Sequence, residues 1–227
     1  MKLLALDTAT ECCSAALLVE DRRFTREAEL VRGHAERILP MVDELLQEGG
    51  VSLRGIDAIA FGRGPGSFTG VRLAASITQG LAFGAGLGVV PVSDLRALAQ
   101  RVFDEDRHVT RALVCNDARM QEVYWGCFER GSGGLAVERT AERVGPAGSV
   151  QLPPGWPDAA GVGRGLAAYP VLKTLAGVAV RPGWDRLLPR AAEVARLAVP
   201  EVAAGRLLVP EAAMPVYLRD DVARPPT

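Results

Sequence analysis

The chain has 227 residues, of which 48% are hydrophobic and 23% are charged, and its formal net charge at pH 7 is -1. This composition is typical of a globular protein with one large or two small domains, and the near-zero charge argues against a surface that binds nucleic acid on its own. The longest apolar stretch, residues 81–92, is shorter than the ~18 residues that cross a bilayer, and the N-terminus lacks a signal-peptide pattern, so we expect a cytoplasmic protein.

The first half of the chain predicts a sheet of three strands followed by alternating helices and strands. Apolar runs of strand length at residues 2–6 and 12–19 are separated by a polar turn, which is typical of a β-hairpin. Residues 34–48 place apolar side chains on one helical stripe, and Gly49 and Gly50 end that helix. In chain order, we expect strands at residues 2–6, 12–19, 23–30, 58–61 and 89–92, and helices at residues 34–48, 68–83 and 94–103.

The same order of elements begins again near residue 111, with strands at residues 112–115 and 122–128. The polar turn 116–119 between them corresponds to the turn 7–10 of the first half, which indicates an internal repeat. The repeat predicts two lobes that face each other across a cleft. We expect an N-terminal βββαβα lobe of residues 1–104, joined by the C-terminal segment 205–227, and a smaller C-terminal lobe of residues 105–204.

The second lobe is predicted to be a degenerate copy of the first. Residues 131–157 are rich in glycine and proline and are expected to form an irregular connection. Short helices are expected near residues 166–175 and 191–203. The proline-rich end of the chain is expected to be disordered.

A glycine-rich turn between a predicted strand and a predicted helix is the first candidate site. Glycine allows a close approach of backbone, and Ser67 or Thr69 can cap the helix that follows. Because the free N–H groups at a helix start favour an anion, the turn fits either a phosphate cradle or a tight structural joint. It matches neither the P-loop nor the dinucleotide-binding fingerprint. Its residues are Gly62, Arg63, Gly64, Pro65, Gly66, Ser67, Phe68, Thr69, Gly70 and Arg72.

Five segments together resemble one protein family. Residues 3–10 are similar to the first hairpin of the actin, sugar kinase and Hsp70 superfamily. The other four, above all the glycine-rich turn and the Asp-Ala-Arg element, look like the bacterial TsaB family, also called YeaZ. They are residues 33–40, 62–72, 117–124 and 215–219. The resemblance covers nearly the whole chain and implies a two-lobe α/β fold of the actin-like ATPase superfamily with a degenerate second lobe.

The resemblance to the TsaB family implies an accessory subunit and not an enzyme. Such a subunit is a non-catalytic paralogue of TsaD and supports the transfer of a threonylcarbamoyl group to the adenosine next to the tRNA anticodon. The implied partners are TsaD, bound through the N-terminal lobe, and the ATPase TsaE, with tRNA bound only within the complex. Two alternatives stay open: a stand-alone ATP-dependent transferase or kinase of the same superfamily, and a peptidase that acts on TsaD.

The resemblance also assigns candidate nucleotide-binding residues in the polar turns of the two lobes, which are Asp7, Thr8, Thr10, Asp117 and Arg119. In the superfamily these turns approach the phosphates, although capping of a tight turn is the simpler role for an aspartate. The catalytic paralogues hold a metal with two histidines, whereas residues 92–97 contain none, and His34 and His108 lie far apart in the sequence. We therefore expect no metal and no cofactor on this chain alone, with ATP or ADP and magnesium entering only in the complex.

Two helices form the predicted partner face. By pattern alone their apolar stripes would belong to the core, but the resemblance assigns this helix pair to the contact with TsaD. The glycine-rich turn is then the joint from which the second helix starts, and Ala75 is expected to be exposed. When TsaD is absent, the same face could pair two copies of the chain. The assigned residues are His34, Ile38, Leu39, Val42, Leu45, Val71, Ala74, Ala75 and Thr78.

Overall fold

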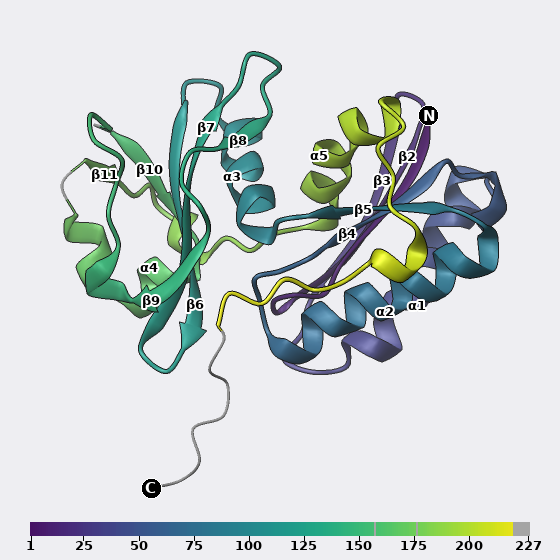
Figure 1. Ribbon diagram of the computed structural model, residues 1–227, viewed down its shortest axis with the longest axis horizontal. Coiled ribbons are helices and arrows are strands. Elements are labelled where there is room, and N and C mark those ends of the chain that lie inside the picture. The colour runs from purple at the N-terminus through teal and green to yellow at the C-terminus, as the bar shows by residue number, and fades with distance from the viewer. Residues whose placement is uncertain (157, 176, 220–227) are drawn as a thin grey trace, which may run out of the picture.

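Two mixed β-sheets, with a pair of helices between them, organise the protein (Figure 1). The computed structural model describes residues 1–156, 158–175 and 177–219. All elements predicted for the first half form, with ends that differ by only one or two residues. The helices and strands are β1 (Lys2–Asp7), β2 (Cys12–Val19), β3 (Arg22–Glu29), α1 (His34–Gly49), β4 (Ala58–Gly62), α2 (Phe68–Ala85), β5 (Gly88–Val92), α3 (Asp94–Glu105), β6 (Arg111–Arg119), β7 (Glu122–Arg130), β8 (Ala136–Glu138), β9 (Arg143–Pro146), β10 (Ala159–Val162), α4 (Arg164–Ala168), β11 (Val178–Ala179) and α5 (Ala191–Ala203).

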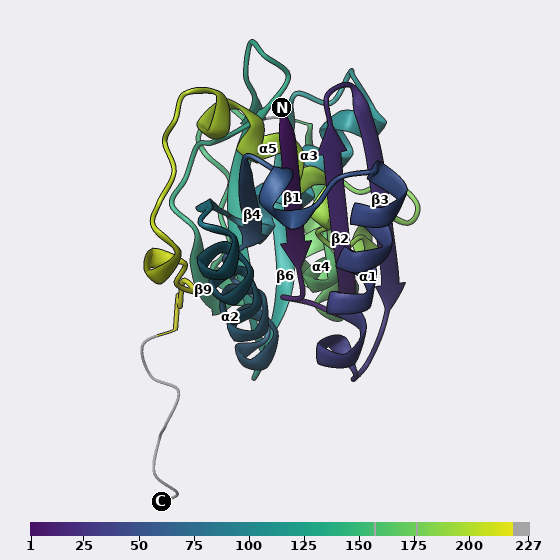
Figure 2. The same ribbon diagram turned by 90° about the vertical axis from the view of Figure 1, so that its right-hand side faces the viewer.

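The first sheet has the strand order β3-β2-β1-β4-β5. β1, β2 and β3 form the predicted antiparallel meander, while β4 and β5 run parallel to β1. Leu4 and Leu6 of β1 face the side covered by α1 and α2, whereas Leu3 and Ala5 face the opposite side. Figure 2 shows α1 in front of β2 and β3, and α2 in front of β4. Both faces of this sheet are therefore buried.

The second sheet has the strand order β11-β10-β6-β7-β8, which corresponds to the first sheet read from β5 to β3. β10 runs parallel to β6, and β7 runs antiparallel to β6. The repeat and the two-lobe α/β fold are thus confirmed. The irregular connection predicted for residues 131–157 is wrong in part, because it contains β8 and β9, which both pair with β7. The helix predicted near residues 166–175 is split, since α4 ends at Ala168 and a short 3-10 helix begins at Pro170, whose nitrogen carries no hydrogen.

Helices α3 and α5 lie between the two sheets (Figure 1). α5 packs on β1, β2, β4 and β5 of the first sheet, and α3 packs on β6, β7 and β8 of the second. The predicted boundary at residue 104 placed α3 in the first lobe and α5 in the second, so each helix covers the sheet of the other lobe. Buried residues that include Val90, Leu98, Val114 and Leu197 form one core through these helices. The boundary at residue 104 therefore does not separate two packing units.

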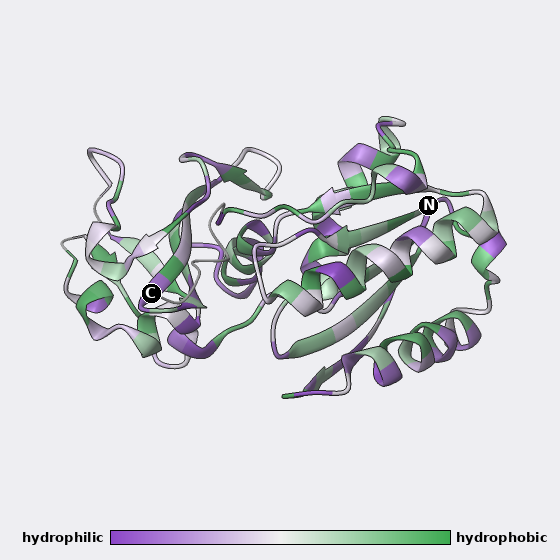
Figure 3. Ribbon diagram, turned by 60° about the horizontal axis from the view of Figure 1, so that its bottom comes forward, coloured by the Kyte–Doolittle hydropathy of each residue, from purple (hydrophilic) through white to green (hydrophobic). Residues whose placement is uncertain are grey.

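The start and end signals of the helices act at the predicted positions. Ser67 caps α2 by accepting a hydrogen bond from the N–H of Gly70 at 3.1 Å, and Ser93 caps α3 in the same way through Arg96. α1 ends at Gly50, whose φ of 66° suits glycine. Figure 3 shows hydrophobic residues along the strands of the first sheet. Among the described residues, no helix is both long enough and apolar enough to span a bilayer.

The described part of the C-terminal segment returns to the first sheet. Leu208 exchanges two backbone hydrogen bonds with Val89 of β5, each of 2.9 Å. Ala213 is fully buried in the core that α1 and α2 cover. The predicted disorder of the chain end falls on residues 220–227, which lie outside the described residues.

Candidate functional site

The glycine-rich turn packs directly against the polar turn that follows β1. The N–H of Ser67 donates to the carbonyl oxygen of Ala9, and the hydroxyl of Thr8 donates to the carbonyl oxygen of Gly70, both at 2.7 Å. A Cβ on Gly66 would meet the carbonyl oxygen of Ala9, and a Cβ on Gly70 that of Thr8, in both cases closer than the 3.0 Å that real Cβ atoms keep. Because the turn holds the chain's own backbone, its geometry supports a structural joint over a phosphate cradle.

Two carboxyl groups are buried together at the end of β1 and the start of α3. Asp7 and Asp94 are both fully buried. Asp7 accepts a hydrogen bond from the N–H of Ala9 at 2.8 Å, and Asp94 accepts one from the N–H of Gly64. Burial raises the pKa of Asp7 to about 6. Burial, followed by the charge of Asp7 and a hydrogen bond to it, holds the pKa of Asp94 well above its usual range, which favours the protonated form of Asp94.

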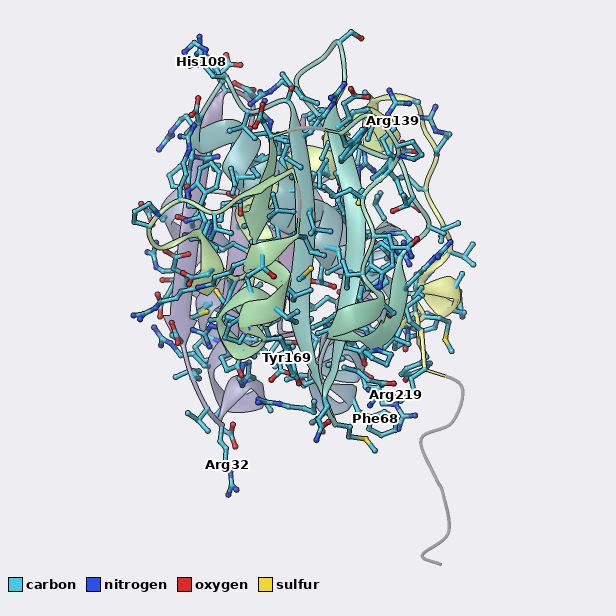
Figure 4. The ribbon with its side chains drawn as sticks, turned by 90° about the vertical axis from the view of Figure 1, so that its left-hand side faces the viewer. Arg32, Phe68, His108, Arg139, Tyr169 and Arg219 are labelled. Atoms are coloured by element: carbon cyan, nitrogen blue, oxygen red, sulfur yellow. The ribbon has the colours of Figure 1, made fainter. Side chains whose placement is uncertain are left out.

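A cavity of about 420 Å³ opens between the lobes, next to both polar turns. It lies at the end of the molecule where Figure 4 labels Phe68 and Arg219. Asp7 and Thr8 do not line it, because both side chains are buried and form hydrogen bonds with the backbone of Ala9 and Gly70, respectively. The residues that were predicted separately and that the structure brings together here are Thr10, His34, Pro65, Gly66, Ser67, Phe68, Val71, Asp117 and Arg119.

The charged groups around this cavity pair with one another. The Nη1 of Arg119 lies 3.0 Å from the Oδ2 of Asp117, and its Nη2 lies 3.3 Å from the Oε1 of Glu11, so this arginine links the two lobes. The Nε2–H of His34 donates to the carbonyl oxygen of Thr10 at 2.9 Å. Arg119 and His34 therefore serve contacts within the chain.

Asn116 also lines the cavity, but its side chain makes no such contact among the described residues. It is only 5% exposed, and neither its amide nitrogen nor its amide oxygen has a hydrogen-bond partner among the described residues. Sequence reasoning placed Asn116 in the polar turn but not among the candidate site residues. The available signal was its position directly after the buried apolar run 112–115.

The C-terminal segment, which the sequence did not place at a site, forms one wall of the cavity. The N–H of Val216 donates to the carbonyl oxygen of Arg63 at 2.8 Å. The hydroxyl of Tyr217 accepts a hydrogen bond from the Nε of Arg72 at 2.7 Å. Arg219 then reaches the hairpin between β6 and β7. The segment thus connects the start of α2 with the second lobe.

The predicted partner face is wrong in its choice of residues. Seven of them are at most 3% exposed, so they offer a partner almost no surface; they are Ile38, Val42, Leu45, Val71, Ala74, Ala75 and Thr78. Ala75 in particular was expected to be exposed. Leu39 is 44% exposed and His34 is half-buried. The outer sides of α1 and α2 instead present residues such as Leu39, Ser76, Gly80, Phe83 and Gly84.

Metal-ligating residues are scattered in the part of the chain that the structure describes. No group of three or more histidine, cysteine, aspartate or glutamate side chains there could hold a metal ion. The four cysteines are buried free thiols, and burial raises their pKa values. They are Cys12, Cys13, Cys115 and Cys127.

Comparisons with known proteins agree on one family. The family model of TsaD, tRNA N6-adenosine threonylcarbamoyltransferase, matches residues 28–157. The tRNA threonylcarbamoyladenosine biosynthesis protein TsaB of Escherichia coli is 43% identical over 98% of this chain and 96% of its own length. Two solved structures from Pseudomonas aeruginosa, one described as YeaZ and one as an uncharacterized protein with similarity to peptidase YeaZ, are 44% identical. They cover 96% of this chain and 99% of their own, with TM-scores of 0.87 and 0.89. The chain therefore belongs to the TsaB family, also called YeaZ.

Proposed function

We propose that this protein is a non-catalytic subunit of tRNA threonylcarbamoyladenosine biosynthesis that binds TsaD through its N-terminal lobe and acts together with TsaE. Family membership supports the pathway, and the match to the TsaD family model supports pairing between two related chains. The tRNA and any ATP, ADP or magnesium are then bound by the assembled complex. The main observation that supports the partner role is the exposure of glycine and apolar residues on the outer side of α2.

The outer side of α2 offers a partner both close access and apolar surface. Gly80 and Gly84 are exposed, and a Cβ at either position would meet no atom within 4 Å. Phe83 on the same helix is 73% exposed, and Leu39 on α1 is 44% exposed. Glycines let a second helix approach closely, and burial of exposed apolar side chains against a partner favours binding. In the absence of TsaD, the same face is expected to pair two copies of the chain.

Replacing Gly80 by arginine is expected to abolish binding of TsaD without unfolding the chain. The new side chain has room in the isolated protein, and arginine is a better helix former than glycine by about 0.5–1 kcal/mol, but it would fill the space that a partner helix needs. Size-exclusion chromatography with TsaD measures the binding, and thermal unfolding measures the fold. Gly148→Arg, an equally open position in the second lobe, is the control and is expected to bind normally. Co-elution of the Gly80→Arg chain with TsaD would show that this side of α2 is not the interface.

A stand-alone ATP-dependent transferase or kinase would differ from this subunit in a direct assay. We expect no turnover of ATP with magnesium by the chain alone, and tRNA modification when the chain is combined with TsaD, TsaE and the threonylcarbamoyl donor. Turnover by the isolated chain would reject the non-catalytic role. For the peptidase alternative, incubation with TsaD is expected to leave TsaD uncleaved.

A further inference from the structure

Asp7 and Asp94 place two carboxyl groups next to each other at Gly62, where the glycine-rich turn begins. Asp7 ends β1, Asp94 begins α3, and both are fully buried. A Cβ on Gly62 would lie within 3.0 Å of the Oδ1 atoms of both, so the two groups are neighbours. The Oδ2 of Asp7 and the Oδ1 of Asp94 meet no N–H or O–H donor among the described residues. A proton held between the two carboxyl groups supplies the missing donor.

The charged groups around the pair do not neutralise it. Within the described ranges, neither Asp7 nor Asp94 forms an ion pair, and the four charged or titratable side chains that surround them already have other partners. These four are His34 of α1, Arg63 of the glycine-rich turn, Glu142 between β8 and β9, and Glu193 of α5. Two buried carboxylates that lie side by side without a counter-ion repel each other, so the pair keeps one proton to a higher pH than a free carboxyl group does.

The pair ties two turns to the start of α3. Asp7 accepts a hydrogen bond from the N–H of Ala9, in the turn after β1, at 2.8 Å. Asp94 and Gly64 share two hydrogen bonds: the N–H of Gly64 donates to the Oδ2 of Asp94, and the N–H of Asp94 donates to the carbonyl oxygen of Gly64 at 3.0 Å. The C-terminal segment lies against the same turn, because a Cβ on Gly64 would be 3.1 Å from the carbonyl oxygen of Val216. A movement of Gly64 would therefore reach the C-terminal segment as well as α2.

We propose that the two carboxyl groups form a proton-controlled lock on the glycine-rich turn. With one proton between them, Asp94 holds the N–H of Gly64 and the turn stays closed. When the pH rises and this proton is lost to water, the two anions repel each other. Asp94 is then the group that moves and releases Gly64, because Asp7 belongs to a strand that has paired strands on both sides. The lock is internal to this chain and does not rest on the proposed binding of TsaD.

A pH titration of the full, ¹³C- and ¹⁵N-labelled chain by nuclear magnetic resonance, from pH 5 to 9, tests the lock without any variant. We expect the carboxyl carbons of Asp7 and Asp94 to shift along one common curve. The N–H proton of Gly64 is expected to follow this curve upfield, because it loses its hydrogen bond, and the amides of Phe68 and Val216 are expected to shift with it. Ionisation that left the bond in place would instead move the Gly64 proton downfield, since a charged acceptor strengthens a hydrogen bond.

Three results of this titration would overturn the proposal. A downfield shift of the Gly64 proton would show that the turn stays bound to the ionised Asp94. Titration of the carboxyl carbons without a shift at Phe68 and Val216 would show that the proton affects the stability of the chain and not its conformation. The third result is that neither carboxyl carbon titrates in this range.

Two variants connect the shifts to this pair. Asp94→Asn keeps the hydrogen bonds of protonated Asp94 but cannot ionise, so the Gly64 proton of this chain is expected to show no such titration. Asp43→Asn, at an exposed position on α1, is the matched control and is expected to keep the native curve. The spectrum of each variant at pH 5 shows whether it is folded. A Gly64 curve in the folded Asp94→Asn chain that equals the native curve would contradict the assignment of the lock to Asp7 and Asp94.

Discussion

Gly70→Ala is expected to lower the free energy of unfolding by at least about 3 kcal/mol, a large part of the 5–15 kcal/mol that holds a typical domain together. The added methyl group would overlap the carbonyl oxygen of Thr8 and crowd the hydroxyl of Ser67, which caps the same helix. The carbonyl oxygen of Thr8 cannot move freely, since it belongs to the backbone at the end of a buried strand, and the hydroxyl of Thr8 already donates to the carbonyl oxygen of Gly70. The first turn of α2 would have to shift away from β1.

Thermal and urea unfolding measure this effect, and a drop in melting temperature of roughly 10 °C is the expected result. Gly80→Ala is the control, because it adds the same methyl group to the same helix where nothing lies within 4 Å. That change is expected to stabilise the chain by about 0.5–1 kcal/mol. Similar melting temperatures for the two variants would mean that the close approach of the turn to Thr8 is not needed for folding.

Asp94→Asn is expected to make the protein more stable at pH 7 and above, and to change its stability little near pH 4. Asparagine can accept the hydrogen bond from Gly64 and donate one to Asp7, as protonated Asp94 does. It achieves this without taking up a proton. In the native chain, the raised pKa of Asp94 instead favours the uptake of a proton on folding, which becomes harder as the pH rises.

The sign follows from the direction of the two pKa changes. Folding raises the pKa of Asp94 well above its usual range and that of Asp7 from 3.8 to about 6, so the folded state binds more protons than the unfolded state above pH 4. The stability that this pair contributes is therefore complete at low pH and is lost as the pH rises from the unfolded pKa through the folded pKa. The loss is up to about 1.4 kcal/mol per pH unit for each proton taken up.

Urea unfolding at pH 5, 6, 7 and 8 gives the free energy of unfolding of the native and Asp94→Asn chains. The difference between the two chains at each pH isolates this contribution from all other titrating groups. The advantage of the asparagine variant should grow with pH at up to about 1.4 kcal/mol per unit. Asp43→Asn, on the exposed side of α1, removes a carboxylate without this environment and should show no such slope. A difference that is independent of pH, or an asparagine variant that is less stable at pH 8, would contradict the shared proton.

The fold of the first lobe could be predicted because its elements are long and clearly bounded. The run 12–19 is a full strand between two polar turns, and α1 ends at a glycine with a positive φ. β8 and β9 were missed because segments of three or four residues carry no readable period. They exist because the open edge of β7 supplies hydrogen-bonding groups, which a linear pattern does not reveal.

The candidate site was predictable only in part. Helical periodicity shows which residues share a stripe, but it does not show whether that stripe faces the sheet or solvent, and so Leu45 and Ala75 were assigned to the wrong side. The cavity depends on contacts between distant parts of the chain. Asn116 and Tyr217 line the same space although about a hundred residues separate them, and no local pattern connects them.

The layer of α3 and α5 has a consequence for any attempt to divide the chain. A fragment that ends at residue 104 would keep α3 without the strands on which it packs, and would leave Ala5, Ala16 and Ala60 uncovered because α5 comes much later. The complementary fragment would carry α5 with no sheet to cover. We therefore expect neither half to fold on its own and the two lobes to unfold in one cooperative transition, so shortened versions made to map binding should keep both.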